Sequence, residues 1–477
     1  MAGAETTVER LRLYLSQLQP QTRSLLIGEL ERSVLRGDDI VGVDLSLQEW
    51  LLFELRRLVR QERAPVPRSS PAARLFFKPL EPFLVDGRVG GQQQGRLARA
   101  SLETLWTWIG RDLLPQDAQR FSDEVGAALL GGDTRQAEYL TRAFQDRAAV
   151  AIEAALAADG ERSYRRLRAQ IGTPHATEDA STLKSVLMGR DALDSLATHL
   201  PLRISNLNGQ RLDEYKALID GIAARNRVLM PYALLVVMSR LSLPWQLVRL
   251  GVRAAGSDIA ARIAETPYAA AVTVVLGELD RLIGELRDDL RSGEGVALGA
   301  LLKAIHDFAR GLRTEIDLPM ESTWGRALAA QRAQIASLVR SEIESMPGRV
   351  RRLLRPRALA EIPPGGVLDR SEVEEIAALV DFVGACRYFA GELALNEMTQ
   401  RACSELQHYL DNATRSLLDG LRQAGDAERA FRQSQLDAAV SLCSRVFGDD
   451  YAAVLGRAAE AARLGERRLA RAARTPI

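Results

Sequence analysis

The chain has 477 residues, a formal net charge of +1 and 47% hydrophobic residues, values typical of a globular protein. A net charge so close to zero gives no general sign of binding to nucleic acid or another polyanion. Aromatic residues make up only 5%, and the abundance of Ala, Leu and Arg favours helices over sheets. The basic residues are nearly all arginines, so the chain is arginine-rich. Its length suits several domains or one long helical array.

Residues 1–63 are expected to form N-terminal helices. The clearest of them follows Ser46 and Glu49, which have the spacing of a capping box. Behind this pair, apolar residues recur every three to four positions along one face, the pattern of an amphipathic helix.

Residues 64–100 are expected to be a linker that contains an extended Phe/Pro-rich segment. Pro79 and Pro82 lie within that segment and should prevent a regular helix. Its three phenylalanines have two interpretations. We favour an extended segment that lies across a helical body, and the alternative is an exposed segment that binds a partner. The residues concerned are Phe76, Phe77 and Phe83.

Residues 101–171 return to a helical pattern, with Asp133 and Gln136 as a cap for a helix that runs to about Ala158. Residues 172–181 are expected to form a loop.

Residues 182–360 are expected to form the central helical core, because they contain two uncharged runs of 12 residues. These runs extend from Val228 to Ser239 and from Thr266 to Gly277. A membrane span needs about 18 or more apolar residues, so the runs indicate buried helices and a protein that is not transmembrane. The second helix should begin at Pro267, with Thr266 as its cap.

A Pro/Gly linker at 361–369 precedes the C-terminal helical bundle, residues 371–477, whose first helix should be capped by Ser371 and Glu374. No repeat period stands out in the chain. The fold class that follows is all-α, either a multi-helix bundle or an irregular α-solenoid array.

The three cysteines, Cys386, Cys403 and Cys443, are too few and too far apart for a disulfide framework or a zinc site. We interpret them as small core residues in a reducing compartment. The first residues have no apolar signal segment, which adds to the expectation of a cytoplasmic protein.

Two histidine patterns could carry chemistry. Glu405 and His408 have the E-x-x-H spacing of di-iron bundles, but the chain contains only one such motif. His306 and Asp307 are adjacent, as in some metal-dependent hydrolases, without further histidines at a convincing spacing. The common nucleotide, hydrolase and zinc-protease motifs do not occur in the sequence. We therefore expect no cofactor and no catalytic residue.

The densest charge cluster lies between Pro347-Gly348 and Pro356, which should bracket a short surface helix or turn. Its arginines could bind phosphates of nucleic acid or an anionic membrane surface. We favour internal pairing with acidic helix faces, because the net charge is near zero. This arginine cluster consists of Arg349, Arg351, Arg352, Arg355 and Arg357.

The function expected from these patterns is that of a non-enzymatic helical scaffold or adaptor that binds other proteins. One alternative is peripheral binding to anionic lipid or nucleic acid through the arginine cluster. Another is a metal-dependent hydrolase that uses His306 and Asp307. The oligomeric state is left open.

Overall fold

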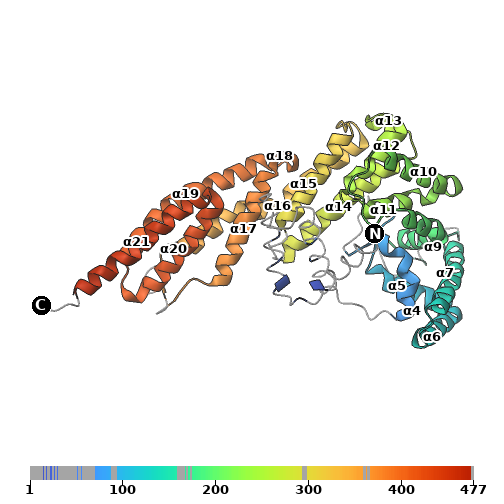
Figure 1. Ribbon diagram of the computed structural model, residues 1–477, viewed down its shortest axis with the longest axis horizontal. Coiled ribbons are helices and arrows are strands. Elements are labelled where there is room, and N and C mark those ends of the chain that lie inside the picture. Colours follow the sequence, from blue (N-terminus) through green and yellow to red (C-terminus); the bar gives the residue numbers. More distant parts are fainter. Residues whose placement is uncertain are drawn as a thin grey trace. The chain divides into compact units, whose positions relative to one another are not determined.

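The computed structural model describes the all-α architecture of most of the chain (Figure 1). The described ranges are residues 70–86, 94–157, 175–292, 298–357, 361–362 and 366–473. A few single positions are also described: Tyr14, Leu15, Leu18, Thr22, Arg23, Leu26, Leu30, Leu51, Leu55, Leu167, Gln170 and Ile171. Within these residues, helices predominate and the strands are limited to one pair of two-residue strands. The predicted N-terminal helices and the linker at 64–69 lie almost entirely outside them.

The chain forms two compact units, each assembled from segments far apart in sequence. Unit 1 consists of residues 1–56, 286–306 and 332–477. Unit 2 consists of residues 57–285 and 307–331. Three helices contribute residues to both units: α14 (Ala269–Ser292), α15 (Leu298–Glu315) and α16 (Thr323–Leu354). None of the described helices is both long and apolar enough to cross a membrane.

Unit 2 begins with short elements that lead into longer helices. The short elements are α4 (Pro71–Phe77), the 3-10 helix η1 (Lys78–Phe83), β1 (Leu84–Val85) and β2 (Leu97–Ala98). The strands pair in parallel, with Leu84 opposite Leu97. Next come α5 (Ser101–Trp108), the π-helix η2 (Ile109–Leu113), α6 (Pro115–Leu130), α7 (Thr134–Ala157), α9 (Ala176–His199) and α10 (Gly209–Arg225). The last group is η3 (Arg227–Leu229), α11 (Met230–Arg240), η4 (Pro244–Leu247), α12 (Val248–Ala255) and α13 (Ala260–Ala264).

The Phe/Pro-rich segment is helical, so the prediction of an extended segment is wrong. Ser70 caps α4 by accepting a hydrogen bond from the Ala73 backbone N–H at 3.2 Å, and Pro71 takes the first helical position. A proline lacks a backbone N–H, and from Lys78 the chain continues in the tighter 3-10 form, which accommodates Pro79 and Pro82. The segment is therefore built of short helices and is not an extended chain that lies across a helical body.

The predicted core helices are confirmed. In α11 every side chain from Tyr232 to Met238 is buried, and Leu276 on α14 is buried as well. The predicted cap of α14 is wrong, because the Thr266 hydroxyl donates to the Ile263 carbonyl at 2.8 Å and α14 begins at Ala269. The apolar runs therefore predicted correctly which helices are buried, but they did not predict the residue at which α14 begins.

Two more predicted helix starts had different outcomes. The Asp133 carboxylate accepts from the Gln136 N–H at 2.9 Å, so the predicted cap of α7 is confirmed. At α17 (Arg370–Tyr388) the cap is Asp369, which accepts from the Ser371 N–H at 2.9 Å. The predicted cap, Ser371, is therefore wrong. Serine and aspartate are both good capping residues, and in the structure Asp369 takes this role. The predicted loop at 172–181 is too long, because α9 begins at Ala176.

The C-terminal part of unit 1 is a bundle built around one enclosed helix. Its members are α17, the short α18 (Ala390–Leu393), α19 (Asn396–Gln423), α20 (Asp426–Phe447) and α21 (Asp449–Ala473). Helix α20 packs against α17, α19 and α21. Among its described side chains, those that are exposed are Asp426, Ala430, Asp437 and Arg445. Its buried residues include the small side chains Ala438, Ala439 and Cys443.

The burial of Leu235 and Leu276 leads to a stability prediction. Replacing either residue by alanine should lower the free energy of unfolding by about 2–5 kcal/mol, because each change leaves a cavity in the core. Chemical denaturation followed by circular dichroism measures the change. Leu202→Ala is the matched control, since Leu202 is exposed and should cost less than about 0.5 kcal/mol. Equal effects at buried and exposed positions would contradict the assignment of the core.

Candidate functional site

The three phenylalanines of the Phe/Pro-rich segment lie in the interior. Phe76, Phe77 and Phe83 are all buried, and the Gln145 side chain donates to the Phe76 carbonyl at 2.8 Å. Phe76 also packs against the Phe144 ring, with centroids 5.4 Å apart. Since the partner-segment interpretation needs exposed rings, the structure favours a role in packing.

The arginine cluster lies on the last turns of α16 rather than on a separate short segment. The helix continues through Pro347 and ends at Leu354, so Pro347-Gly348 does not bracket the cluster as predicted. Proline removes one helical hydrogen bond. Val350 and Leu353 are nevertheless buried on the inner face, and this packing offsets the loss.

Three arginines of the cluster form ion pairs with neighbouring segments of unit 1. Arg349 pairs with Glu375 of α17. Arg351 pairs with Glu405 of α19 at 2.6 Å, and its guanidinium also lies 5.7 Å from the centroid of the Tyr409 ring. Arg355 lies 3.9 Å from Glu361. These contacts agree with the prediction that the arginine cluster pairs with acidic residues inside the protein.

Helix α20 holds the backbone at the end of the cluster. The Gln435 side chain donates to the Arg355 carbonyl at 2.8 Å, and Arg432 donates to the Arg357 carbonyl at 2.9 Å. The Arg357 guanidinium lies over the Phe431 ring, 5.1 Å from its centroid. Arg352 is exposed, and the described residues offer it no ion pair. The cluster is thus largely engaged in holding the bundle together.

Neither histidine pattern gathers a set of metal ligands. Glu405 binds Arg351, while His408 lies 3.4 Å from the Asn412 side-chain nitrogen. The His306 ring packs against the Phe389 ring at a centroid distance of 4.8 Å. Throughout the described ranges, no three His, Cys, Asp or Glu side chains are placed to hold a metal ion.

The cysteines are free thiols. Cys386 and Cys443 are buried and Cys403 is half-buried. Burial raises the pKa of the Cys443 thiol to about 12, and it also raises the pKa values of Cys386 and Cys403. These groups therefore remain protonated and weakly nucleophilic near neutral pH, as expected of core residues.

An open depression of about 430 Å³ lies at the start of α10. Asn206, Asn208, Arg249 and Arg253 line it. Both arginines already have partners in unit 2, because Arg249 binds Glu315 at 2.5 Å and Arg253 binds Asp213 at 2.7 Å. The charges of its two arginines are therefore balanced within the protein.

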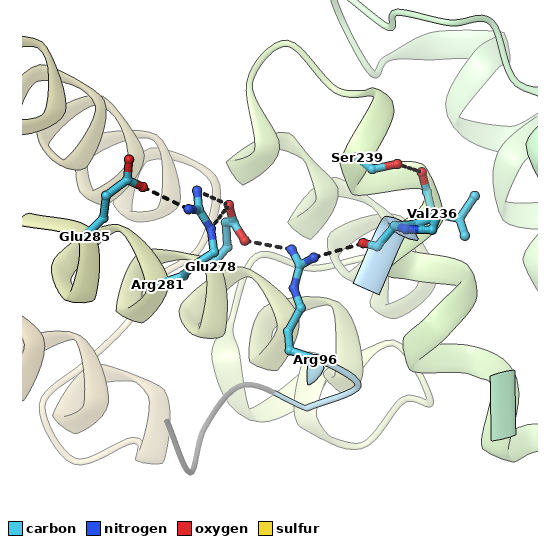
Figure 2. A network of polar contacts seen from close by, with 7 residues as sticks. Arg96, Val236, Ser239, Glu278, Arg281 and Glu285 are labelled. Carbon is cyan, nitrogen blue, oxygen red and sulfur yellow. Dashed lines mark hydrogen bonds and ion pairs between the residues drawn. The ribbon is translucent and has the colours of Figure 1, made fainter. Parts of the chain in front are cut away.

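A buried network of arginines and glutamates in unit 2 was not anticipated from the sequence (Figure 2). Arg96 donates to Glu278 at 2.7 Å and to the Pro82 carbonyl at 3.0 Å. Arg281 binds the other oxygen of Glu278 at 2.9 Å and also donates to Glu285 at 2.9 Å. Figure 2 shows the four charged side chains in one row between the segment around Arg96 and α14.

The network keeps Glu278 ionised although it is buried. Burial alone would raise the pKa of its carboxyl group, but Arg281 and Arg96 outweigh that effect and hold the pKa below its ordinary value of 4.5. Two guanidinium groups face two carboxylates, so the network is electrically balanced and satisfied from within. It ties the segment before β2 to α14 and has the features of a structural clamp.

A second unanticipated feature is an exposed face formed by α7 and α9, which lie side by side (Figure 1). Three levels of ion pairs cross between these antiparallel helices. At the first level Arg142 lies 2.9 Å from Asp191 and 3.9 Å from Asp194. The second level pairs Asp146 with Arg190 at 2.7 Å, and the third level pairs Glu153 with Lys184 at 3.7 Å. The pairs fix how the two helices align.

Val150 and Met188 occupy the same part of this α7–α9 face. Both lie between the Asp146–Arg190 pair and the Glu153–Lys184 pair. Each residue is also three or four positions from charged residues of the same face on its own helix, so it points the same way. Val150 is 64% exposed and Met188 is 53% exposed. Tyr139, three positions before Arg142, is a further exposed apolar residue on α7.

Sequence reasoning missed this face because each helix alone shows an ordinary polar surface. The face becomes visible only when the charged residues along α7 are matched with those along α9, and these two helices are separated in the chain. Comparisons with protein-family models, curated proteins and solved structures found no match to the chain.

The Glu278 network gives a pH-dependent prediction. Glu278→Gln should lower the free energy of unfolding by about 3–5 kcal/mol at pH 7, because two buried guanidinium groups lose their shared carboxylate. The folded-state pKa lies below the unfolded value, so this stabilisation is complete above about pH 4.5 and is lost as the pH falls further. Urea denaturation should show a larger difference between variant and parent at pH 7 than at pH 3. Glu81→Gln, at an exposed pair with Arg99, is the control. A pH-independent difference would contradict the clamp.

The arginine cluster gives a second prediction. Changing Arg351, Arg352 and Arg355 to glutamine should lower the melting temperature slightly, because exposed ion pairs contribute about 0–1 kcal/mol each. Affinity for anionic vesicles and for duplex DNA should not change. Arg370→Gln, at an exposed arginine of the same bundle, controls for loss of charge. Salt-dependent binding that the triple variant weakens would instead support a polyanion site.

Proposed function

We propose that the protein is a non-enzymatic helical adaptor that binds protein through the α7–α9 face. The observation that carries the proposal is the side-by-side exposure of Val150 and Met188 between two levels of ion pairs. Protein–protein interfaces commonly combine an apolar centre with a polar rim, and aromatic residues and Met are enriched in them. Tyr139 extends the same surface.

The arginine cluster is a weaker basis for function. Arg349, Arg351 and Arg355 are near carboxylates, and Arg357 is stacked on Phe431. A phosphate would have to compete with these contacts. We therefore favour protein over nucleic acid or lipid as the partner.

A cytoplasmic location belongs to the same proposal. It is supported by three free cysteines, two of them buried, which suit a reducing compartment.

The test is to place charge at the centre of the α7–α9 face. The double variant Val150→Glu with Met188→Glu should weaken partner binding by about 2 kcal/mol or more, the size of an interface hot spot. Tagged protein is used to capture partners from its native extract, and quantitative mass spectrometry measures the change. Circular dichroism verifies that the variant is folded.

Matched controls are available at exposed positions elsewhere. Met320 is 61% exposed and Val454 is 58% exposed, close to the values for Met188 and Val150. Met320→Glu and Val454→Glu should leave the captured partners unchanged. If the controls and the double variant lose the same partners, or if neither loses any, the α7–α9 face is not the binding surface.

A further inference from the structure

We infer that Asn208 is a site of spontaneous covalent modification, at which the folded protein loses the side-chain amide and gains aspartate or isoaspartate. The inference is independent of the proposed function, because Asn208 lies at the start of α10 and not on the α7–α9 face. It rests on the residue that follows Asn208, on the exposure of both residues and on the state of their polar groups.

The reaction needs only the chain and water. The backbone nitrogen of Gly209 gives up its proton and attacks the side-chain amide carbon of Asn208. A C–N bond forms, the side-chain nitrogen leaves as ammonia, and the product is a succinimide ring. Water then opens the ring at one of its two carbonyl groups. Opening at the former side-chain carbonyl gives aspartate, and opening at the backbone carbonyl gives isoaspartate.

The residue that follows Asn208 favours ring closure. Asn208 is the only one of the five asparagines that precedes a glycine. Glycine lacks a Cβ, so its nitrogen can approach the preceding side chain with little steric hindrance. Gly209 has a positive φ of 53°, and a Cβ at this position would meet no heavy atom within 4 Å apart from its chain neighbours. The surroundings of the attacking nitrogen are therefore open.

Both reacting groups are also accessible. Asn208 and Gly209 are exposed and line the open depression at the start of α10. The Asn208 side chain makes no capping hydrogen bond to the helix. Gly209 is the first residue of α10, and the first four N–H groups of a helix have no intrahelical partner. Neither a cap nor the helical ladder therefore holds the two groups apart.

The start of α10 favours the charge that develops during the attack. The Gly209 nitrogen loses a proton, and the side-chain oxygen of Asn208 gains negative charge as the new bond forms. The N-terminal end of a helix carries a partial positive charge, which stabilises negative charge close to it. The position thus combines the residue pair, the access and the electrostatics that the reaction requires.

Asn206, two residues earlier, has the opposite arrangement. Its side-chain oxygen accepts a hydrogen bond from Arg249 at 2.8 Å. The next nitrogen belongs to Leu207, which is buried, and its N–H donates to the Gln246 side chain at 2.8 Å. Attack by this nitrogen would break a buried hydrogen bond, so Asn206 should remain unmodified.

The remaining asparagines are also poorly placed to react. The Asn226 side chain accepts from the Val228 N–H at 3.1 Å. Asn412 lies inside α19, where its side-chain nitrogen donates to the His408 carbonyl at 3.0 Å and the next N–H belongs to the helical ladder. Asn396 is the first residue of α19 and precedes a glutamate, whose Cβ hinders the approach. The structure therefore selects one asparagine.

The modification changes both charge and backbone at a defined place. Either product adds a carboxylate at the start of α10, where the helix dipole favours negative charge. Isoaspartate also adds one carbon atom to the backbone between Leu207 and Gly209. Only the aspartate product therefore keeps the backbone path into the helix unchanged.

Site-resolved mass spectrometry tests the inference on the full chain. The folded protein is incubated at pH 8 and digested with trypsin, which cuts after Arg203 and Arg211 and releases one peptide that contains both Asn206 and Asn208. Fragment ions assign the mass gain to one of the two, and a sample taken at time zero corrects for conversion during digestion. Conversion should occur at Asn208 alone, and part of the product should be isoaspartate, which enzymatic methylation detects.

A denatured sample shows whether the fold leaves the site reactive. Conversion of Asn208 in the folded protein should be of the same order as in urea, because the fold does not restrain the two groups. If Asn208 remains unmodified in the folded protein, whatever its behaviour in urea, the inference is overturned. Conversion of Asn206 or Asn412 in the folded protein at the rate of Asn208 would also overturn it.

A variant tests the succinimide route. Gly209→Ala should slow the conversion of Asn208 by about an order of magnitude, because the added Cβ hinders the attacking nitrogen. Gly221→Ala is the matched control, since Gly221 lies in the same helix and has open space around it, and it should leave the rate unchanged. Circular dichroism verifies that both variants are folded. An unchanged rate in Gly209→Ala would contradict attack by this nitrogen, and the comparison of asparagines in the parent protein does not depend on either variant.

Discussion

The desolvation of Glu278 is the constraint that ties the segment around Arg96 to α14. A carboxylate removed from water is costly unless cations replace its hydration. Arg281 supplies one cation from the next turn of α14, and Arg96 supplies the other from 182 residues earlier in the chain. The second contact holds β2 and the residues around it against α14. Gly95, beside Arg96, has a positive φ of 76°, and a Cβ there would lie 2.9 Å from the Leu235 side chain. Charge pairing and close packing therefore fix the same segment.

Unit 1 uses its arginines differently. Those at the end of α16 lie near the surface, where each ion pair is worth little. Their contribution comes from the number of segments that they reach, namely α17, α19 and the residues around Glu361. Side chains of α20 bind the carbonyl groups at the end of the same helix. The planar guanidinium group suits such multiple contacts, because it can pair with carboxylates and stack on aromatic rings.

The α7–α9 face is organised by ion pairs between the two helices. Within the chain, the pairs fix the alignment of the two helices. Val150 and Met188 add exposed apolar surface between two of these pairs.

The sequence by itself determined the all-α class, the burial of α11 and of Leu276, and the cap at Asp133. Periodicity and capping are local properties, so they can be read along the chain. Only the tertiary structure decided that α16 continues through Pro347, that Phe76 and Phe83 lie in helical interior segments, and which carboxylate each arginine binds. Those outcomes depend on partners far away in sequence, whose packing outweighs local preference. The α7–α9 face was hidden for the same reason, since it exists only where two separate helices meet.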